Sequence, residues 1–274
     1  AAEEMLRRAS EIIGRSASAN GRVWGGTFHA TANRLLRIYG PAAGLEGDFT
    51  VMDRSDAEDM LDMIRHELGL DSRDRRFPRK QTCMDIYSRC VNASEELVNV
   101  LKRHFPWCAD HGGDLKLLFR RYVERKQQHN VLDYDDLLLY WAHLVSDEAV
   151  SREMGSRFDH ILVDEYQDTN RVQSEILRGM RRHSQNIMAV GDDAQSIYSF
   201  RAATVRNMLD FPRHFPGATV LTLDQNYRSV MPILEATNGV IAQARDRYTK
   251  NLWSSRKGGS RPKLVTCRDE RNQD

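Results

Sequence analysis

The stretch from Phe158 to Asn170 constrains the fold of this chain more than any other. Its short apolar run, 161–163, ends directly in two adjacent carboxylates, Asp164 and Glu165. Short apolar runs bounded by polar residues are typical of buried parallel strands, and ligands of open α/β sheets bind beyond the carboxyl ends of such strands. The two acids would then lie where a metal ion and an attacking water act in nucleoside triphosphate hydrolysis. A surface turn is the simpler explanation of the acid pair taken alone.

Two further strand signals end in polar residues. Residues 186–190 run into Gly191-Asp192-Asp193, and residues 219–223 run into the segment 224–229. Between the first two strands we expect a helix from Thr169, as N-cap, to about Arg182, which would bury Val172, Ile176, Leu177 and Met180. Strands separated by helices form parallel sheets with right-handed crossovers. The pattern predicts an α/β fold whose three polar strand ends converge at one edge.

The first seventy residues show mainly helical patterns. An amphipathic helix is expected over 1–13, a short strand and turn over 23–29, and a helix over 30–39 with Leu35, Leu36 and Ile38 inward. The next helix, 55–68, has Ser55 or Asp53 as candidate N-cap and Gly69 as its stop. The chain opens without an initiator Met or a cap, which predicts that it begins inside an element.

Residues 71–130 carry no strand signal, and we interpret them as a helical subdomain inserted into the α/β domain. Two basic clusters in it are equally compatible with phosphate contacts and with solvated helix faces: Arg73, Arg75, Arg76, Arg79 and Lys80, and Arg120, Arg121, Arg125 and Lys126. A helix then opens at 132–141, and capping is the preferred explanation of Asp133 and Asp135. After Met231-Pro232 a helix is expected to about Arg247, then a loop over 257–262 and a strand stub at 264–265.

The composition and charge of the chain exclude several classes of protein. The net charge of the 274 residues is +1, so nucleic-acid binding must come from local patches. Four cysteines in a chain of this length do not form a disulfide scaffold and suggest reduced thiols in the cytoplasm. Cys108 lies near His104 and His111 but without paired metal-ligand spacing. No apolar stretch approaches the length of a membrane span, and no signal peptide opens the chain, so no membrane partner is expected.

Four stretches carry a resemblance to a known family. They are Thr27-Phe28-His29 with Arg34, then 164–170, 191–201 and 225–229. In order and spacing they resemble successive motifs of the UvrD/Rep/PcrA-type superfamily-one DNA helicases, and residues 1–8 resemble the segment after the Walker A loop of that family. The resemblance implies a RecA-like P-loop NTPase fold: a parallel sheet with helices on both faces and an inserted all-helical subdomain.

The resemblance also implies roles for single residues, with ATP and Mg²⁺ as cofactors. Asp164 would hold Mg²⁺, and Glu165 would be the base for the attacking water. Gln195 would sense the γ-phosphate and couple it to DNA. Arg228 would reach the γ-phosphate and stabilise charge in the transition state, and Tyr227 would stack on the adenine.

A second set would face single-stranded DNA: Thr27, Phe28, His29, Tyr198, Phe200 and Arg201. Aromatic side chains that stack on bases without sequence preference suit a translocating protein. Family members often carry Trp where this chain has Phe200, and Gly where it has Ala202. Without the resemblance, core packing would be the preferred explanation of Phe28, Tyr198 and Phe200.

The chain lacks two sequence features of the family. It contains no G-x-x-x-x-G-K-[ST] sequence and lacks the later motifs of a second RecA-like domain. The resemblance therefore implies an internal fragment that is inactive alone. Its parts would be 1–70, the truncated start of the first RecA-like domain; 71–130, the helical insertion; 131–226, the continuation of the first domain; and 227–274, the start of the second.

The expected function of the intact protein is ATP-driven movement on single-stranded DNA and unwinding of duplex junctions, with repair or replication proteins as partners. Two rivals stay open. One is a remnant that only binds DNA or a partner protein, which the missing Walker A loop favours. The other is a metal-dependent nuclease or phosphohydrolase with a two-metal carboxylate cluster formed by Asp164, Glu165, Asp168, Asp192 and Asp193.

Overall fold

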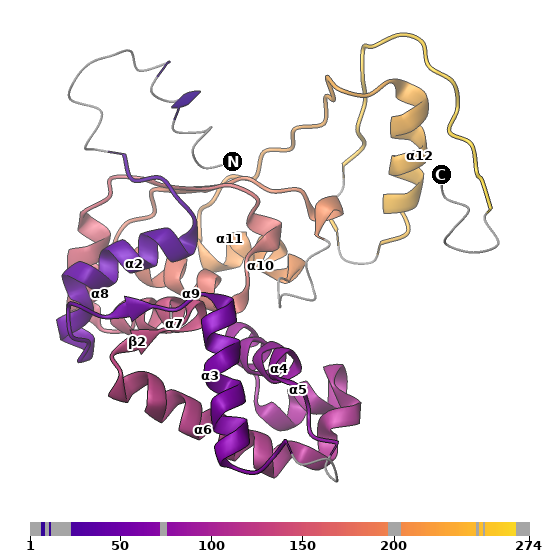
Figure 1. The fold of residues 1–274 in the computed structure, drawn as a ribbon. Coiled ribbons are helices and arrows are strands. Elements are labelled where there is room, and N and C mark those ends of the chain that lie inside the picture. The colour runs from indigo at the N-terminus through magenta and orange to yellow at the C-terminus, as the bar shows by residue number, and fades with distance from the viewer. Residues whose placement is uncertain are drawn as a thin grey trace.

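The computed structural model describes residues 7, 8, 11, 23–71, 76–196, 204–244, 247–248 and 250–266. Helices dominate these residues, and two short parallel sheets accompany them (Figure 1). The elements pack around separate hydrophobic cores, which together position the polar ends of β3 and β4. None of the described helices combines the length and the apolar character that crossing a membrane would require.

The first core joins the helices that flank the acid motif. It packs α2 (Phe28–Tyr39), α7 (Tyr134–Leu144), α8 (Glu148–Ser156) and α9 (Arg171–Met180), with the turn η1 (Gly40–Ala43). Fully buried Leu35, Leu36 and Ile176 lie in this cluster. The spacing of apolar residues in α9 gives it one buried face, and Val172, Ile176, Leu177 and Met180 are buried as predicted.

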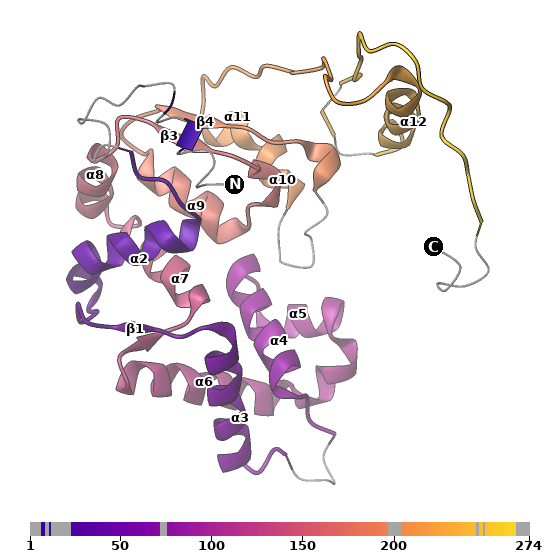
Figure 2. The same ribbon diagram turned by 45° about the horizontal axis from the view of Figure 1, so that its top comes forward.

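The second core is all-helical. It joins α3 (Arg54–Glu67), α4 (Lys80–Ala93), α5 (Leu97–His104), η2 (Pro106–His111) and α6 (Gly112–Gln128). Figure 2 shows these helices as one group below α2, α7 and α9. We call this group the helical unit. Short strands β1 (Thr50–Val51) and β2 (Val131–Leu132) pair in parallel where the chain enters and leaves it. Its core includes α3, so it begins at Met52, before the predicted subdomain.

A cluster of buried charges lies between α6, α4 and the start of α7. Lys126 Nζ donates to Asp133 Oδ2 at 2.7 Å, to Asp136 Oδ2 at 2.6 Å and to Tyr87 Oη at 3.2 Å. Tyr122 Oη donates to the same Asp133 oxygen at 2.8 Å. Burial works against the charge of Lys126, but the two carboxylates outweigh it and raise the pKa of the ammonium group. The cluster therefore holds a charged lysine inside the protein.

The site-bearing sheet consists of β3 (Ile161–Val163) and β4 (Ile187–Ala189), which pair in parallel with Val163 opposite Ala189. One face packs on α9 and on α10 (Val205–Leu209) and α11 (Phe211–His214). On the other face Leu162 is 69% and Met188 57% exposed. The prediction of two parallel strands with a crossing helix is confirmed, whereas the expectation of fully buried strands is wrong.

The C-terminal described part contains α12 (Met231–Ile241), which ends before the predicted Arg247. Figure 1 shows α12 standing away from the remaining helices. Gln225 and Trp253 form an isolated parallel bridge beside it. Residues 219–223 are not a strand, and Leu221 and Leu223 are 82% and 84% exposed. Residues 264–265 are likewise not a strand. Both strand predictions are wrong, because neither apolar run has a hydrogen-bonding neighbour among the residues that the structure describes.

Several helix boundaries differ from prediction for local reasons. Residues 23–29 form no strand: Thr27 caps α2, whose first turn holds Phe28 and His29. Ile38, predicted inward, is 43% exposed. Asn170, not Thr169, caps α9, because its side chain accepts from Gln173 N in a reciprocal capping box. The predicted cap at Asp53 and the stop at Gly69, with φ +66°, are confirmed.

Capping explains Asp133 but not Asp135. Asp133 accepts from Asp136 N at 2.8 Å and forms a capping box at the start of α7. Asp135 instead accepts hydrogen bonds from Ser88 and, at 2.7 Å, from Asn92 Nδ2, both on α4.

The helix 1–13 lies mostly outside the described residues. Cys83, Cys90 and Cys108 are free thiols, and burial raises the pKa of Cys83 to about 12.

We predict that Gly179→Ala destabilises the first core. A Cβ at this position would lie 2.4 Å from Val145 Cγ2 and 3.0 Å from the Val145 carbonyl oxygen, so backbone must move. Overpacking of this kind costs about 1–3 kcal/mol. Urea unfolding followed by circular dichroism measures the loss. Gly113→Ala, where nothing lies within 4 Å, is the matched control and should not lower stability. Equal stability of the two variants would contradict this packing.

Candidate active site

The acid pair follows directly from the end of β3. Val190 N donates to Val163 O at 2.8 Å and Tyr166 N to Val190 O at 2.9 Å, so β4 holds the chain on both sides of the pair. Between these anchors Glu165 adopts a left-handed backbone, φ 51° and ψ 44°. That conformation costs a residue with a Cβ about 1–2 kcal/mol. Both residues are exposed and follow directly after the end of β3.

Gln167 joins the polar ends of the two strands. Its side chain is 1% exposed. Nε2 donates to Glu165 Oε2 at 2.6 Å, while Oε1 accepts from Asp192 N at 2.9 Å. Gly191 lets the strands approach this closely, since a Cβ there would lie 2.7 Å from Gln167 Oε1. The buried amide thus fixes one oxygen of Glu165 relative to the end of β4.

Gln195 lies at the other end of the same chain of hydrogen bonds. It closes the turn η4 (Asp193–Gln195), and its Nε2 donates to Asp192 Oδ2 at 2.8 Å. Burial tends to raise the pKa of Asp192, but hydrogen bonds from Gln195 and Lys250 and the Lys250 charge outweigh it and lower that pKa. Glu165, Gln167, Asp192 and Gln195 therefore form one continuous array across the sheet edge.

Lys250 was not predicted to belong to this site. Its Nζ forms ion pairs with Asp192 and, at 2.8 Å, with Asp193 Oδ1. Tyr248 N donates to Asp193 Oδ2 at 2.8 Å, and Tyr248 Oη to Met208 O at 3.0 Å. The segment after α12 thus returns to the edge of β4. No periodicity in the sequence around Lys250 signals this contact.

Arg228 and Tyr227 lie on the segment that precedes α12, apart from the acid pair. Asn226 Oδ1 accepts from Arg228 N at 2.9 Å and from Ser229 N at 2.7 Å, which shapes this turn. Tyr227 is 73% exposed and its Oη donates to Gln225 Oε1 at 2.8 Å. Among the described residues, no hydrogen bond or ion pair joins this turn to Asp164, Glu165 or Gln195.

The predicted DNA-facing residues that are described lie at the start of α2. Thr27 Oγ1 accepts from Ala30 N at 3.2 Å, and Thr27 is exposed. Phe28 is half-buried and its ring centroid lies 6.2 Å from that of Trp141, so it also packs in the core. The His29 ring meets Tyr134 edge-on at 5.6 Å, and burial lowers the pKa of His29. Tyr198, Phe200 and Arg201 lie outside the described residues.

The basic clusters are largely engaged within the protein. Lys126 is buried in its carboxylate cluster, Arg125 pairs with Glu67 at 2.7 Å, and Arg121 pairs with Glu124 at 3.3 Å. Lys80 pairs with Asp59. These contacts favour the solvated-face interpretation for Lys80, Arg121 and Arg125 and a structural role for Lys126. Arg73 and Arg75 lie outside the described residues.

The carboxylates of the nuclease alternative do not assemble. Over the described part of the chain, no group of three or more His, Cys, Asp or Glu side chains is placed to hold a metal ion. Asp192 and Asp193 are instead paired with Lys250. This arrangement argues against a carboxylate cluster for two metals, and leaves Asp164 as a single candidate ligand.

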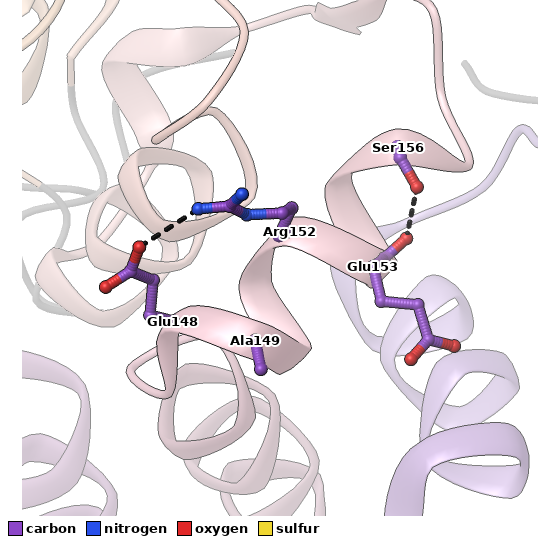
Figure 3. A pocket seen from close by; sticks show the side chains of 5 residues that line it. All are labelled: Glu148, Ala149, Arg152, Glu153 and Ser156. Carbon is purple, nitrogen blue, oxygen red and sulfur yellow. Dashed lines mark hydrogen bonds and ion pairs between the residues drawn. The ribbon is translucent and has the colours of Figure 1, made fainter.

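Figure 3 shows a hollow that lies on one helix and holds no predicted site residue. Its lining comes from α8 alone: Glu148, Ala149, Arg152, Glu153 and Ser156. Arg152 pairs with Glu148 at 3.1 Å, and Ser156 Oγ donates to the Glu153 carbonyl at 2.8 Å. Both polar contacts are local to the helix, so this surface carries no site chemistry.

The fold and the edge of its β3–β4 sheet define an α/β protein with a strand-end acid site. The sequence profile of the UvrD/REP helicase N-terminal domain matches residues 1–216. The chain therefore belongs to the UvrD/REP helicase family, and the resemblance noted from its motifs is confirmed.

Curated relatives agree with this assignment. The chain is 34% identical to a probable DNA helicase II homolog of Rickettsia conorii, with 100% of this chain and 41% of the relative aligned. It is 31% identical to the ATP-dependent DNA helicase PcrA of Staphylococcus epidermidis, across 100% of this chain and 36% of the relative. It is 34% identical to the ATP-dependent DNA helicase UvrD1 of Mycobacterium tuberculosis, across 94% of this chain and 34% of the relative. The chain thus spans less than half the length of these relatives.

Proposed function

We propose that the full-length protein containing this chain is an ATP-dependent DNA helicase. It would couple hydrolysis of Mg-ATP to movement along single-stranded DNA and to separation of strands at duplex junctions, in the cytoplasm, alongside proteins of DNA repair or replication. Membership of the helicase family and the names of the relatives support this proposal. The observation that carries it is the array Glu165–Gln167–Asp192–Gln195 at the sheet edge.

Glu165 is the proposed general base for the attacking water. Gln167 holds Oε2 at 2.6 Å, so the second oxygen, Oε1, is the acceptor for the proton of a water molecule. The left-handed turn at Glu165 and the two β4 contacts restrict where that oxygen can lie. A base with a fixed position accelerates hydrolysis because little reorientation remains to be done in the transition state.

Asp164 fits the proposed role of magnesium ligand. Among the described residues its Oδ1 accepts only the neighbouring Glu165 N–H, at 3.0 Å, and Asp164 is exposed. Mg²⁺ is commonly bound through one or two carboxylates, with water and substrate phosphates completing the shell, so a single acid at a strand end suffices. When bound, the ion would neutralise phosphate charge.

Gln195 is the proposed sensor of the γ-phosphate, and Arg228 and Tyr227 are the proposed contacts to the γ-phosphate and the adenine. Gln195 already shares a hydrogen-bond chain with Glu165. The turn with Tyr227 and Arg228 belongs to the α12 region, which stands apart in Figure 1. We propose that this region closes on the β3–β4 edge when nucleotide binds, which would bring a positive charge to the transferring phosphate.

The fold proposal is a RecA-like parallel sheet with helices on both faces, an inserted helical subdomain and the start of a second domain. The second core extends from Met52 to Val131, which supports a wider insertion than 71–130. Thr27, Phe28 and His29 at the start of α2, with Tyr198, Phe200 and Arg201, are the proposed contacts to single-stranded DNA.

Strand separation tests this function. The full-length protein is mixed with a duplex that carries a single-stranded tail, and release of one labelled strand is followed with and without Mg-ATP. The proposal predicts release that requires ATP and a tail. Cleavage of the DNA with Mg²⁺ alone, or tail binding without release under any nucleotide, would contradict it.

A further inference from the structure

A half-buried polar node connects the helical unit to the acid motif. Asn92, in the last turn of α4, lies at its centre. Its Nδ2 donates to Asp135 Oδ1 on α7 at 2.7 Å and to Ser88 O at 2.8 Å. Its Oδ1 accepts from Asn170 Nδ2 at 2.7 Å. One amide side chain therefore touches three elements: α4, α7 and the start of α9.

Asn170 makes two further hydrogen bonds. Its Oδ1 accepts from Gln173 N at 2.9 Å, which caps α9, and its backbone carbonyl accepts from Asn207 Nδ2 at 2.9 Å. Asn170 is 7% exposed and Asp135 is 6% exposed. Because these polar atoms are buried, removing the amide that joins them takes the hydrogen-bond partner from one Asp135 oxygen and from the Asn170 NH₂ group, which is costly.

The acid motif spans the distance between two anchors. At one end the β4 ladder holds Val163 and Tyr166, and at the other end Asn92 holds Asn170. Asp164 and Glu165 lie on a left-handed turn between Val163 and Tyr166. Gln167, whose Nε2 holds Glu165 Oε2, lies between the two anchors, so release of Asn170 would loosen the segment that carries this amide.

We infer that Asn92 is a positioning residue for the active site, and that through it the helical unit holds the acid motif in its working geometry. The inference rests on the proposed function for its kinetic consequence but not for its structural one. Displacement of α4 by anything that binds the helical unit would be passed to Asn170, and from there to Glu165.

Hydrogen exchange of this chain tests the structural part. In Asn92→Ala, backbone amides of residues 164–174 should exchange about 10-fold faster, while those of α5 and α6 should keep their protection. Asp85→Ala is the matched control, because Asp85 also lies on α4 and makes a cross-element contact, 2.5 Å to Arg54, that does not reach Asn170. Unchanged exchange over 164–174, or an equal increase everywhere, would overturn the inference.

Kinetics of the full-length protein test the functional part. Asn92→Ala should lower kcat for ATP hydrolysis about 10-fold with little change in KM, because a misplaced base affects the transition state more than nucleotide binding. Asn92→Asp should be at least as harmful, since it places a second carboxylate beside Asp135. Adding Asp135→Asn should restore part of the rate, because donor and acceptor are then exchanged across the contact.

The two proposals fail in different ways. Wild-type protein without ATP hydrolysis would overturn the proposed function and leave the exchange result standing. An active wild type with normal kcat in both Asn92 variants would overturn the positioning role alone. A raised KM with normal kcat would also count against it, because the residue would then act on nucleotide binding.

Discussion

Replacing Glu165 by Gln in the full-length protein will remove ATP hydrolysis while ATP binding remains. Loss of a general base typically costs about 10²–10⁴ in rate. Gln keeps the size of the side chain and an amide oxygen that can still accept from Gln167 Nε2, so the turn should keep its shape. Phosphate release measures turnover, and quenching of a fluorescent ATP analogue measures binding.

Glu148→Gln is the control for this experiment. Glu148 is an exposed carboxylate on α8 that pairs with Arg152, one turn away on the same helix. Its replacement should leave turnover within experimental error of wild type. Turnover by Glu165→Gln at the wild-type rate would remove Glu165 from the role of base, and loss of nucleotide binding would show that it supports the site structurally.

Replacing Lys126 by Met will destabilise the chain strongly. The Lys126 side chain is 3% exposed and faces Asp133, 2% exposed, and Asp136, 11% exposed. Met fills similar space but leaves two carboxylates buried without a cation, and removing one partner of a buried ion pair costs about 3–5 kcal/mol. Urea unfolding of the chain measures the loss in free energy of unfolding.

The control and the pH dependence sharpen this prediction. Lys116→Met, at an exposed position of the same helix, should change stability by less than about 0.5 kcal/mol. Burial and the neighbouring Asp133 raise the pKa of Asp136 to about 6. Lys126 lowers this pKa, so its loss raises the pKa of Asp136 further, and the deficit of Lys126→Met should shrink as the pH falls toward 6, where the buried carboxyl of the variant is protonated. Equal stability of the two variants would contradict the cluster.

The paired strands and the helix between them could be predicted from sequence. Residues 161–163 and 186–190 are apolar runs that end in acids and glycine, and the spacing between them fits one crossing helix. The hydrophobic pattern and the residues that end each strand therefore indicate the same elements. The burial of Ile176 and its neighbours in α9 follows from the same pattern. Local capping chemistry was informative too, as at Asp53 and Asp133.

Other elements could not be predicted because they depend on distant neighbours. Residues 219–223 have the composition of a strand, but a strand requires a partner, and these residues have none among those described. Residues 23–29 combine strand-forming Val23 and Trp24 with a helix cap at Thr27, and the cap prevails. Propensity alone does not decide such a conflict.

The positions of the acidic residues in the candidate site could be predicted from sequence, but the hydrogen bonds and ion pairs that connect them could not. Asp164, Glu165 and Gln195 lie along one sheet edge as their strand-end positions suggest. Gln167 was seen only as part of a motif, yet it carries the link between the strands. Lys250 and Asn92 act across 58 and 78 residues of sequence, and no local pattern reports contacts of that range.

ATP hydrolysis by the full-length protein, measured with and without single-stranded DNA, tests the central claim most directly. The account predicts Mg²⁺-dependent turnover that rises at least about 10-fold when single-stranded DNA is added, because the proposed γ-phosphate sensor and the proposed DNA-facing residues would form one coupled site. Turnover that does not respond to DNA, or no turnover at all, would contradict the assignment of the sheet edge as the ATPase site of a DNA translocase.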